Sequence, residues 1–238
     1  MKLENKIAVI TGAGKGIGKA AAEMFLKEGA SVVLNSKTKA DLDSFVNENS
    51  SYKSKILTVP GDISDEAVIK EVIKKTIENF KQVDILVNNA GFGIFDDFID
   101  STNKDFDDMF NTNVRAVYIL TRDFLPYMIK RKEGTIINIA SISGKNGVPG
   151  GAIYSATKHA VMGLSRSIMF EVRKHGVRVI AICPGSVDTK FFRKTASQLK
   201  NESMLTPDDI ADTILYAATL PPNATVNEIE IRPANPKK

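Results

Sequence analysis

Short apolar runs alternate with longer amphipathic stretches along almost the whole chain. The short runs are rich in valine and isoleucine and stay apolar at consecutive positions, as expected of strands covered on both faces. These predicted strands lie at residues 6–11, 31–35, 55–59, 84–87, 135–139, 177–182 and 228–231, and helical patterns lie between them at 17–27, 65–80, 105–130, 154–174 and 207–219.

The regular order of strand, helix and strand predicts an α/β fold, a doubly wound parallel sheet of about seven strands with helices on both faces. No linker-like segment and no short-period repeat interrupts this order. We therefore expect a single domain over residues 1–238, with a frayed tail at residues 233–238.

Composition narrows the possible functions. The chain has 238 residues, of which 43% are hydrophobic and 25% charged, and its net charge of +4 is spread along the sequence. So small an excess does not favour nucleic-acid binding, and one cysteine without a Cys/His cluster argues against a disulfide framework or a metal site. There is no leader pattern and no apolar run near the ~20 residues that span a bilayer, so we expect a cytoplasmic protein without a membrane partner.

A glycine-rich turn joins the first predicted strand to the first predicted helix, with glycine at positions 12, 14, 16 and 18. Glycine lets the backbone turn tightly and approach a pyrophosphate, while the helix N-terminus offers free N–H groups to the anion. The place between a strand and a helix favours a dinucleotide site over a purely structural turn. The candidate binding residues of this turn are Gly12, Lys15, Gly16, Ile17 and Gly18.

The end of the second predicted strand indicates which dinucleotide is bound. An acid about 20 residues past the turn would hold the 2′-hydroxyl of NAD. The chain instead has Asn35, Ser36 and Lys37 there, so no carboxylate is available, while Lys37 and Lys15 could both reach a 2′-phosphate. We therefore expect NADP(H) as the cofactor, with Ser36 and Lys37 among its ligands.

Tyr154 and Lys158 lie four residues apart in a predicted helix, so their side chains share one face. A phenol titrates near pH ~10 in isolation, and a nearby cation favours the phenolate. We therefore expect Lys158 to lower the pKa of Tyr154 toward neutrality and make the phenol a proton donor and acceptor. Tyrosine and lysine at this spacing are usually a half-buried ring beside a solvated amine, so the motifs around the pair decide the interpretation.

Six motifs in register resemble the short-chain dehydrogenases/reductases, a family of single-domain Rossmann-fold oxidoreductases. The resemblance covers nearly the whole chain. Its motifs are the turn with Thr11, Gly12, Gly16 and Gly18, the run Asn88, Asn89, Ala90 and Gly91, then Asn113, Ser141, the pair Tyr154 and Lys158, and Pro184 with Gly185.

The resemblance implies a role for each candidate catalytic residue. Tyr154 would protonate a carbonyl oxygen as hydride arrives from the nicotinamide, or remove the proton of an alcohol in the reverse direction. Lys158 would lower the phenol pKa and bond the nicotinamide ribose. Ser141 would hold the substrate oxygen, and Asn113 would kink its helix and hold a water that links Lys158 to solvent.

The same resemblance assigns the remaining cofactor contacts. Asp62 and Ile63 would lie against the adenine, and Val187 and Thr189 would bond the nicotinamide carboxamide. The other residues placed along the cofactor are Asn89, Ala90, Gly91, Tyr154, Lys158, Pro184 and Gly185.

The substrate region is expected at residues 142–152 and 184–207. Its aromatic residues are Phe92, Phe95, Phe191 and Phe192, and its possible anion contacts are Lys145, Asn146, Lys190 and Arg193.

Three functions stay open at this point. The body of the chain resembles 3-oxoacyl-(acyl-carrier-protein) reductases, which act on acyl thioesters. The ending at residues 227–233 resembles enzymes that act on small 3-hydroxy acids, hydroxy-amino acids and semialdehydes. A non-enzymatic NADP-binding sensor is the alternative from another class, and the complete set of candidate catalytic residues argues against it.

Assembly is expected from surface apolarity. The predicted helices 105–130 and 154–174 are apolar around much of their circumference, including Ile168, Met169 and Phe170. This is more apolar surface than one sheet covers. Because such helices form subunit contacts in the family, we expect a homotetramer.

Overall fold

A computed structural model describes residues 1–189, 191 and 204–234 of the chain. Seven strands form one sheet in the order β3-β2-β1-β4-β5-β6-β7, and every neighbouring pair is parallel. The predicted fold class is confirmed, and each predicted strand lies within two residues of an observed one. The strands are β1 (Ile7–Ile10), β2 (Ser31–Ser36), β3 (Ile56–Pro60), β4 (Ile85–Asn88), β5 (Gly134–Ile139), β6 (Val177–Pro184) and β7 (Glu228–Ile231).

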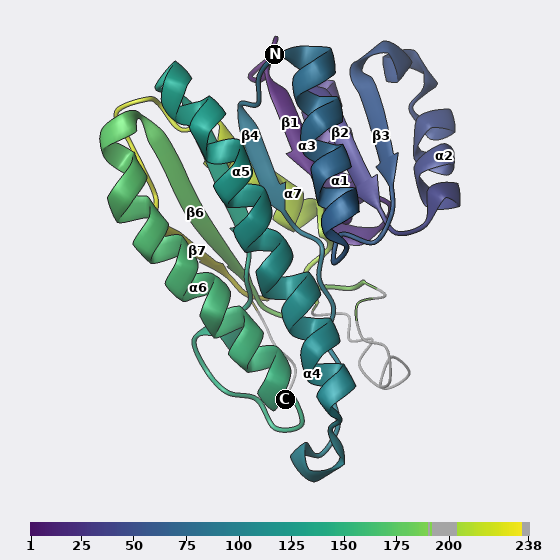
Figure 1. The fold of residues 1–238 in the computed structure, drawn as a ribbon, viewed down its shortest axis with the longest axis vertical. Coiled ribbons are helices and arrows are strands. Elements are labelled where there is room, and N and C mark those ends of the chain that lie inside the picture. Colours follow the sequence, from purple (N-terminus) through teal and green to yellow (C-terminus); the bar gives the residue numbers. More distant parts are fainter. Residues whose placement is uncertain (190, 192–203, 235–238) are drawn as a thin grey trace.

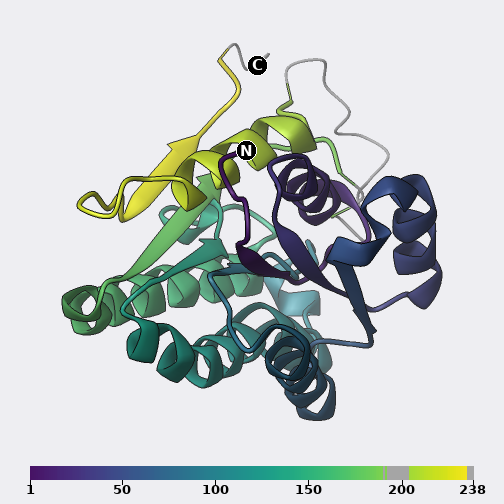
Figure 2. The same ribbon diagram turned by 90° about the horizontal axis from the view of Figure 1, so that it is seen from above.

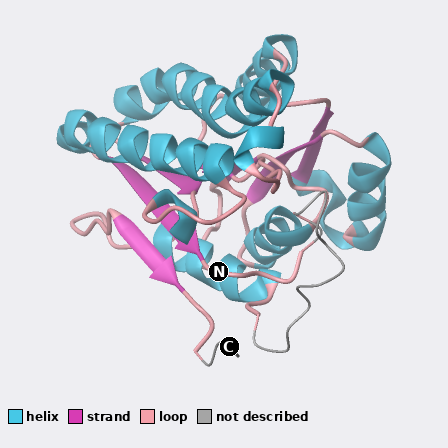
Figure 3. Cartoon of the chain, turned by 90° about the horizontal axis from the view of Figure 1, so that it is seen from below, coloured by secondary structure: helices cyan, strands magenta, loops and turns pink. Residues whose placement is uncertain are grey.

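Helices cover both faces of the sheet (Figures 2 and 3). On one face α1 (Gly16–Lys27) packs beside α7 (Pro207–Ala218), and α2 (Lys39–Glu48) lies outside β3 at the edge (Figure 1). The other face carries α3 (Glu66–Phe80), α5 (Ala116–Arg131) and α6 (Ala152–Val172). The buried apolar residues accordingly form two main clusters, one on each side of the sheet. Both faces are covered because the strands are apolar at consecutive positions.

Short helical segments complete the chain. They are η1 (Ser50–Lys55), η2 (Phe98–Asp100), η4 (Ile142–Gly144) and η5 (Arg173–His175), together with α4 (Asn103–Phe110) and the π-helical turn η3 (Asn111–Arg115). Within the part of the chain that the structure describes, no helix has the length and apolarity needed to cross a bilayer.

Helix α2 was not among the predicted helices. Its buried residues are Leu42 and Phe45, three positions apart on one face, and the rest of the helix is polar or partly exposed. So small an apolar stripe produces a weak periodic signal, and packing against the sheet edge supplies what the pattern lacks. The omission matters because α2 begins immediately after β2, where a nucleotide ribose is expected.

The predicted helix 105–130 is interrupted. Helix α4 leads into the π-helical turn η3, and α5 continues from it to Arg131. A π turn accommodates one extra residue, and such turns are common at functional sites. Asn113 lies within this turn and is buried, so the helix departs from α geometry at the residue expected to kink it.

The strand order places the site. Strand β1 lies between β2 and β4, and the strand order reverses at β1. The chain segments that follow β1 and β4 therefore turn to opposite faces of the sheet. In open parallel sheets a crevice forms at this point, beyond the carboxyl ends of the strands. Residues after β1, β2, β4, β5 and β6 therefore converge on one edge of the sheet.

Candidate active site

Two neighbouring cavities open at the carboxyl edge of the sheet. The first, the Tyr154 cavity, has a volume of about 270 Å³ and is lined by Ser141, Tyr154 and Lys158 among others. The second, the Lys37 cavity, has a volume of about 510 Å³ and extends past the end of β2. Asn89 lines the first cavity and Ala90 the second, so the two lie side by side along the loop after β4.

The glycine-rich turn is shaped by close backbone contacts. Gly12 and Gly16 adopt positive φ angles of 64° and 53°, which side-chain-bearing residues rarely do. A Cβ on Gly18 would lie 2.4 Å from the Gly12 carbonyl oxygen, so only glycine lets α1 approach the turn. A Cβ on Gly16 would lie 3.2 Å from Cγ2 of Thr189, which places the turn directly opposite the segment after β6.

Thr11 and Asn89 fasten this turn to the loop after β4. The Thr11 hydroxyl accepts hydrogen bonds from the backbone N–H groups of Asn89 and Ala90, at 3.1 and 3.0 Å. The Asn89 amide in return donates to the Thr11 carbonyl oxygen at 2.9 Å. These bonds set the distance between the turn and the loop, which form opposite walls of the crevice.

The lysines at the Lys37 cavity are ion-paired. Lys37 Nζ lies 2.6 Å from Asp62 Oδ2, and Lys15 Nζ lies 3.1 Å from Asp41 Oδ2. Asn35, the residue at the usual place of an acid, is buried and donates to the carbonyl oxygens of Val59 and Gly61. Asn35 therefore joins β2 to the end of β3, and acids reach this cavity from α2 and from the loop after β3 instead.

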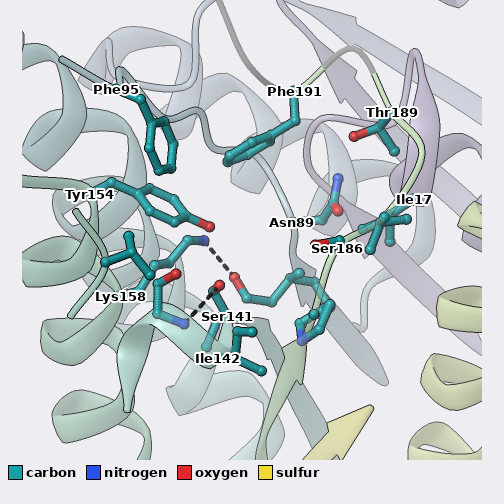
Figure 4. Close-up of a pocket in the computed structure, with 17 residues that line it drawn as sticks. Ile17, Asn89, Phe95, Ser141, Ile142, Tyr154, Lys158, Ser186, Thr189 and Phe191 are labelled. Atoms are coloured by element: carbon teal, nitrogen blue, oxygen red, sulfur yellow. Dashed lines mark hydrogen bonds between the residues drawn. The ribbon is translucent and has the colours of Figure 1, made fainter. Parts of the chain in front are cut away.

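Tyr154 and Ser141 meet in the Tyr154 cavity (Figure 4). Tyr154 comes from the first turn of α6, while Ser141 follows β5 and also caps η4 by accepting a 3.1 Å hydrogen bond from the Ser143 N–H. A hydrogen bond with the Ser141 side chain lowers the pKa of Tyr154, but burial outweighs it and raises that pKa to about 12. The phenol is therefore protonated at neutral pH.

Lys158 does not act on the phenol as the sequence predicted. Its ammonium donates to the Ile139 carbonyl oxygen at 2.8 Å and lies 5.8 Å from the centre of the Tyr154 ring. Burial lowers the pKa of Lys158 to about 8, because removing a charge from water favours its neutral form. The expectation that Lys158 brings the phenol pKa toward neutrality is thus wrong for this structure, since desolvation dominates at both groups.

Asn113 lies beside this pair, behind the loop after β4. Its side chain accepts a 3.0 Å hydrogen bond from the Phe92 N–H and donates to the Phe92 carbonyl oxygen at 2.9 Å and to the Thr157 hydroxyl at 3.1 Å. A Cβ on Gly91 would lie 3.0 Å from Asn113 Oδ1 and 3.7 Å from Lys158 Nζ. Asn113 therefore ties α6 to the loop after β4, next to the lysine.

Aromatic rings cover the Tyr154 cavity. Phe95 and Phe191 lie on two sides of the Tyr154 ring, with centroid distances of 5.5 and 5.6 Å (Figure 4). Ile142 and Val148 add apolar surface to the lining. Among the described residues of the lining, Lys158 is the one with a cationic side chain. The space beside the phenol and Ser141 thus suits an apolar group.

Lys145 is not an anion contact. Its ammonium forms ion pairs with Glu228 and with Glu230 on β7, the second at 2.7 Å, and these raise its pKa. Glu228 is also bound by Arg166 at 2.9 Å. Lys145 therefore joins the loop after η4 to the last strand. Three other predicted substrate contacts, Lys190, Phe192 and Arg193, lie outside the described residues.

The structure brings most of the predicted site residues to these cavities. Gly16 and Gly18 shape the turn without lining either cavity, and Asn113 stands behind the loop. The Tyr154 cavity is lined by Ile17, Asn89, Ser141, Tyr154, Lys158, Pro184, Gly185, Val187 and Thr189, and the Lys37 cavity by Gly12, Lys15, Ser36, Lys37, Asp62, Ile63, Ala90 and Gly91.

Sequence reasoning missed several residues that line the Lys37 cavity. Asp41 belongs to the unpredicted helix α2, whose two buried residues, Leu42 and Phe45, give too weak a pattern to predict it. The others precede α2, follow Asp62 or belong to α4 and the π turn, and no short motif marks them. They are Thr38, Ser64, Lys104, Asp108, Asn111 and Thr112.

Cys183 and the histidines take no part in this arrangement. Cys183 is fully buried in β6, and burial raises the pKa of its thiol to about 11, as expected of an inert apolar-type residue. Within the described residues, no group of three or more His, Cys, Asp or Glu side chains is placed to hold a metal ion.

Comparison with known proteins identifies the family. The short chain dehydrogenase family model matches residues 6–200. An uncharacterized oxidoreductase of Staphylococcus aureus is 38% identical over 231 residues, which is 97% of this chain and 98% of that protein. The 3-oxoacyl-[acyl-carrier-protein] reductase of Thermotoga maritima is 33% identical over 227 residues, or 92% of each chain. The chain therefore belongs to the short-chain dehydrogenase/reductase family of oxidoreductases.

Solved structures of the family resemble this fold closely. A metagenomic short-chain oxidoreductase in complex with NADP is 32% identical, with a TM-score of 0.86 over 99% of this chain and 100% of that one. A Brucella melitensis 3-ketoacyl-(acyl-carrier-protein) reductase complexed with NADH is 31% identical, with a TM-score of 0.87 over 98% of each. A serine dehydrogenase complexed with NADP+ is 29% identical, with a TM-score of 0.88 over 94% of each. These relatives support a nicotinamide cofactor.

Proposed function

We propose that the protein is an NADP(H)-dependent reductase that interconverts a carbonyl group and a secondary alcohol. The observation that carries this proposal is the Tyr154 cavity, where a protonated phenol and the Ser141 hydroxyl lie together under an apolar wall. A carbonyl oxygen placed between these two hydroxyls would accept hydrogen bonds from both. These hydrogen bonds polarise the carbonyl and make its carbon more susceptible to attack by hydride.

The cofactor would lie across both cavities, with its adenosine half in the Lys37 cavity and its nicotinamide half in the Tyr154 cavity. The turn suits a pyrophosphate because Gly12 and Gly16 expose bare backbone at the start of α1. Lys15 and Lys37 at the ribose end favour the 2′-phosphate of NADP(H). When bound, the nicotinamide supplies or accepts the hydride.

The chain's own residues would handle the proton. Tyr154 gives its proton to the oxygen of the substrate, and Ser141 holds that oxygen in place. Lys158, whose ammonium lies 5.8 Å from the centre of the Tyr154 ring, would stabilise the phenolate that results, and its pKa near 8 lets it return a proton near neutral pH. Asn113 holds the backbone of Phe92, and the preceding Gly91 lies beside this lysine.

The protonation state of Tyr154 favours the reductive direction. A phenol with a pKa of about 12 carries its proton throughout the physiological range, which is the state that reduction requires. Oxidation of an alcohol starts from the phenolate, which burial disfavours. The apolar wall further favours a substrate with an apolar arm, as in 3-oxoacyl thioesters.

A second candidate is a dehydrogenase of small 3-hydroxy acids, hydroxy-amino acids or semialdehydes. It is supported by the structural similarity to a serine dehydrogenase and by the ending at residues 227–233. Such a substrate needs a cation beside its carboxylate. Lys145 does not supply one because it is paired with β7.

A substrate panel tests the proposal. The purified protein is mixed with NADPH or NADH and with 3-oxoacyl thioesters, small semialdehydes and diketones, and nicotinamide absorbance is followed. We expect turnover of 3-oxoacyl thioesters, with a kcat/KM for NADPH that exceeds that for NADH. Turnover confined to the semialdehydes would favour the second candidate. No turnover with any member would favour a non-enzymatic NADP-binding protein, and a preference for NADH would contradict the cofactor.

We further propose that the protein is a homotetramer. The exposed faces of α5 and α6 carry Tyr118, Tyr127 and Phe170, and Phe170 is 63% exposed. Met169, one of the residues that made this helix look apolar around its circumference, packs in the core at 4% exposure. Light scattering should give four times the mass of one chain, and Phe170→Glu should lower that mass because it buries a charge in the contact. A wild-type mass of one chain would refute the assembly.

A further inference from the structure

Six charged side chains of the described residues line the Lys37 cavity and form three ion pairs. Lys15 is paired with Asp41, Lys37 with Asp62 and Lys104 with Asp108. Lys15 and Lys37, the two cations that would attract the 2′-phosphate of NADP(H), thus each face a carboxylate. A phosphate that enters this region must exchange these ion pairs for new ones.

Asp41 is well placed to oppose the phosphate. Its side chain is 20% exposed, against 67% for Lys15, so water screens its charge less than that of a surface acid. A Cβ on Gly14 would lie 2.8 Å from Asp41 Cβ and 2.6 Å from the Ser36 hydroxyl. Because Gly14 has no side chain, Asp41 and Ser36 pack directly against the glycine-rich turn.

Asp62 has a different set of contacts. Besides Lys37, its carboxylate accepts hydrogen bonds from the backbone N–H and the hydroxyl of Ser64, at 3.0 and 2.8 Å. These bonds hold the loop after β3, so replacing Asp62 would disturb the cavity wall. Among the described residues, the Asp41 carboxylate is bound by Lys15 alone, so its charge can be removed without breaking a bond that holds a loop.

We propose that Asp41 limits the preference of this protein for NADPH over NADH. Its carboxylate holds Lys15 away from a 2′-phosphate and repels that phosphate, whereas the 2′-hydroxyl of NADH carries no charge to repel. The proposal rests on the NADP(H) function proposed above. Removing the charge of Asp41 leaves the ammonium of Lys15 with its donors available to the phosphate.

Asp41→Asn tests the proposal through binding rather than turnover. The chain has no tryptophan, so the fluorescence of the reduced nicotinamide can be followed during titration without tryptophan emission. We expect Asp41→Asn to bind NADPH about fivefold more tightly, with a Kd for NADH within about twofold of wild type. The gain should shrink in 1 M salt, where the screening length falls to about 3 Å.

Asp43→Asn is the matched control. Asp43 lies on the same helix, pairs with Lys39 at 2.6 Å and lines neither cavity. The substitution removes the same charge two residues away, so neither Kd should change by more than about twofold. Thermal unfolding of both variants checks that α2 remains folded.

The outcomes separate this proposal from the one it rests on. An unchanged ratio of the two Kd values in Asp41→Asn, or weaker NADPH binding, would overturn the role of Asp41 while leaving the NADPH preference of the wild type intact. An equal gain in NADPH affinity in Asp43→Asn would show that the effect comes from net charge alone, which would also overturn the role of Asp41. A wild type that binds NADH more tightly than NADPH would overturn the proposed cofactor itself.

Discussion

Tyr154→Phe should lower kcat by about 10²–10⁴-fold, the range typical of a lost proton donor. The substitution removes one oxygen atom and keeps the ring that Phe95 and Phe191 contact. The Kd for NADPH should therefore stay near the wild-type value. Steady-state reduction of a substrate found in the panel, together with a nicotinamide-fluorescence titration, measures both quantities.

Tyr216→Phe is the control for this prediction. Tyr216 lies on α7 with 55% of its surface exposed and lines neither cavity, so loss of its hydroxyl should leave kcat unchanged. Turnover by Tyr154→Phe at more than a tenth of the wild-type rate would show that another group, with Ser141 the nearest candidate, delivers the proton.

Lys158→Met should lower kcat and weaken NADPH binding together. The methionine side chain is close in length to that of lysine, so the buried space stays filled while the ammonium and its bond to Ile139 disappear. The proposed phenolate then has no neighbouring cation, and the nicotinamide ribose loses a donor. Kinetics and titration of the same variant measure the two effects, and an unchanged Kd with a lowered kcat would limit Lys158 to the proton step.

The same variant should be more stable than the wild type near neutral pH. Burial lowers the folded-state pKa of Lys158 to about 8, below its unfolded value of 10.5. The cost of burying the ammonium is therefore complete below pH ~8, falls as the pH rises, and disappears above about 10.5. By this linkage Lys158→Met gains up to about 3 kcal/mol below pH ~8. Urea unfolding at pH 7 and at pH 9.5 should show a larger gain at pH 7.

A loss of stability at pH 7 would contradict this account of Lys158. Lost rate together with gained stability is the signature of a charge kept in the core for function rather than for folding. Lys174→Met provides the comparison, because Lys174 is exposed in η5 and its replacement should move neither stability nor rate appreciably.

Much of the fold could be predicted from the sequence because each strand has its own local apolar pattern. Runs such as 177–182 are apolar at consecutive positions, and parallel strands buried on both faces need that pattern. The interruption of the predicted helix 105–130 could not be predicted, because a π turn changes the backbone without changing the apolar pattern. Helix α2 was missed because two buried residues, Leu42 and Phe45, are too few to mark it.

The parts of the candidate site that could be predicted from the sequence are those formed by short motifs. Glycine spacing marked the turn, and the spacing from Ser141 to Tyr154 and Lys158 marked the Tyr154 cavity, because short segments fix these positions. The ion pairs of Lys15, Lys37 and Lys145 were not predictable in the same way. Their partners Asp41, Asp62 and Glu228 lie 26, 25 and 83 positions away, and only folding brings them together.

The sequence by itself determined the parallel sheet, the dinucleotide turn and the shared helix face of Tyr154 and Lys158. These depend on residue type and local spacing, which the chain carries whatever surrounds it. Tertiary structure alone decided the electrostatics of the site. Burial raises the pKa of the Tyr154 phenol and lowers the pKa of Lys158. For the phenol this is opposite to what the spacing of the two residues predicted. The lysine ammonium donates to a backbone carbonyl, and removal of the phenol from water outweighs the effect of this cation.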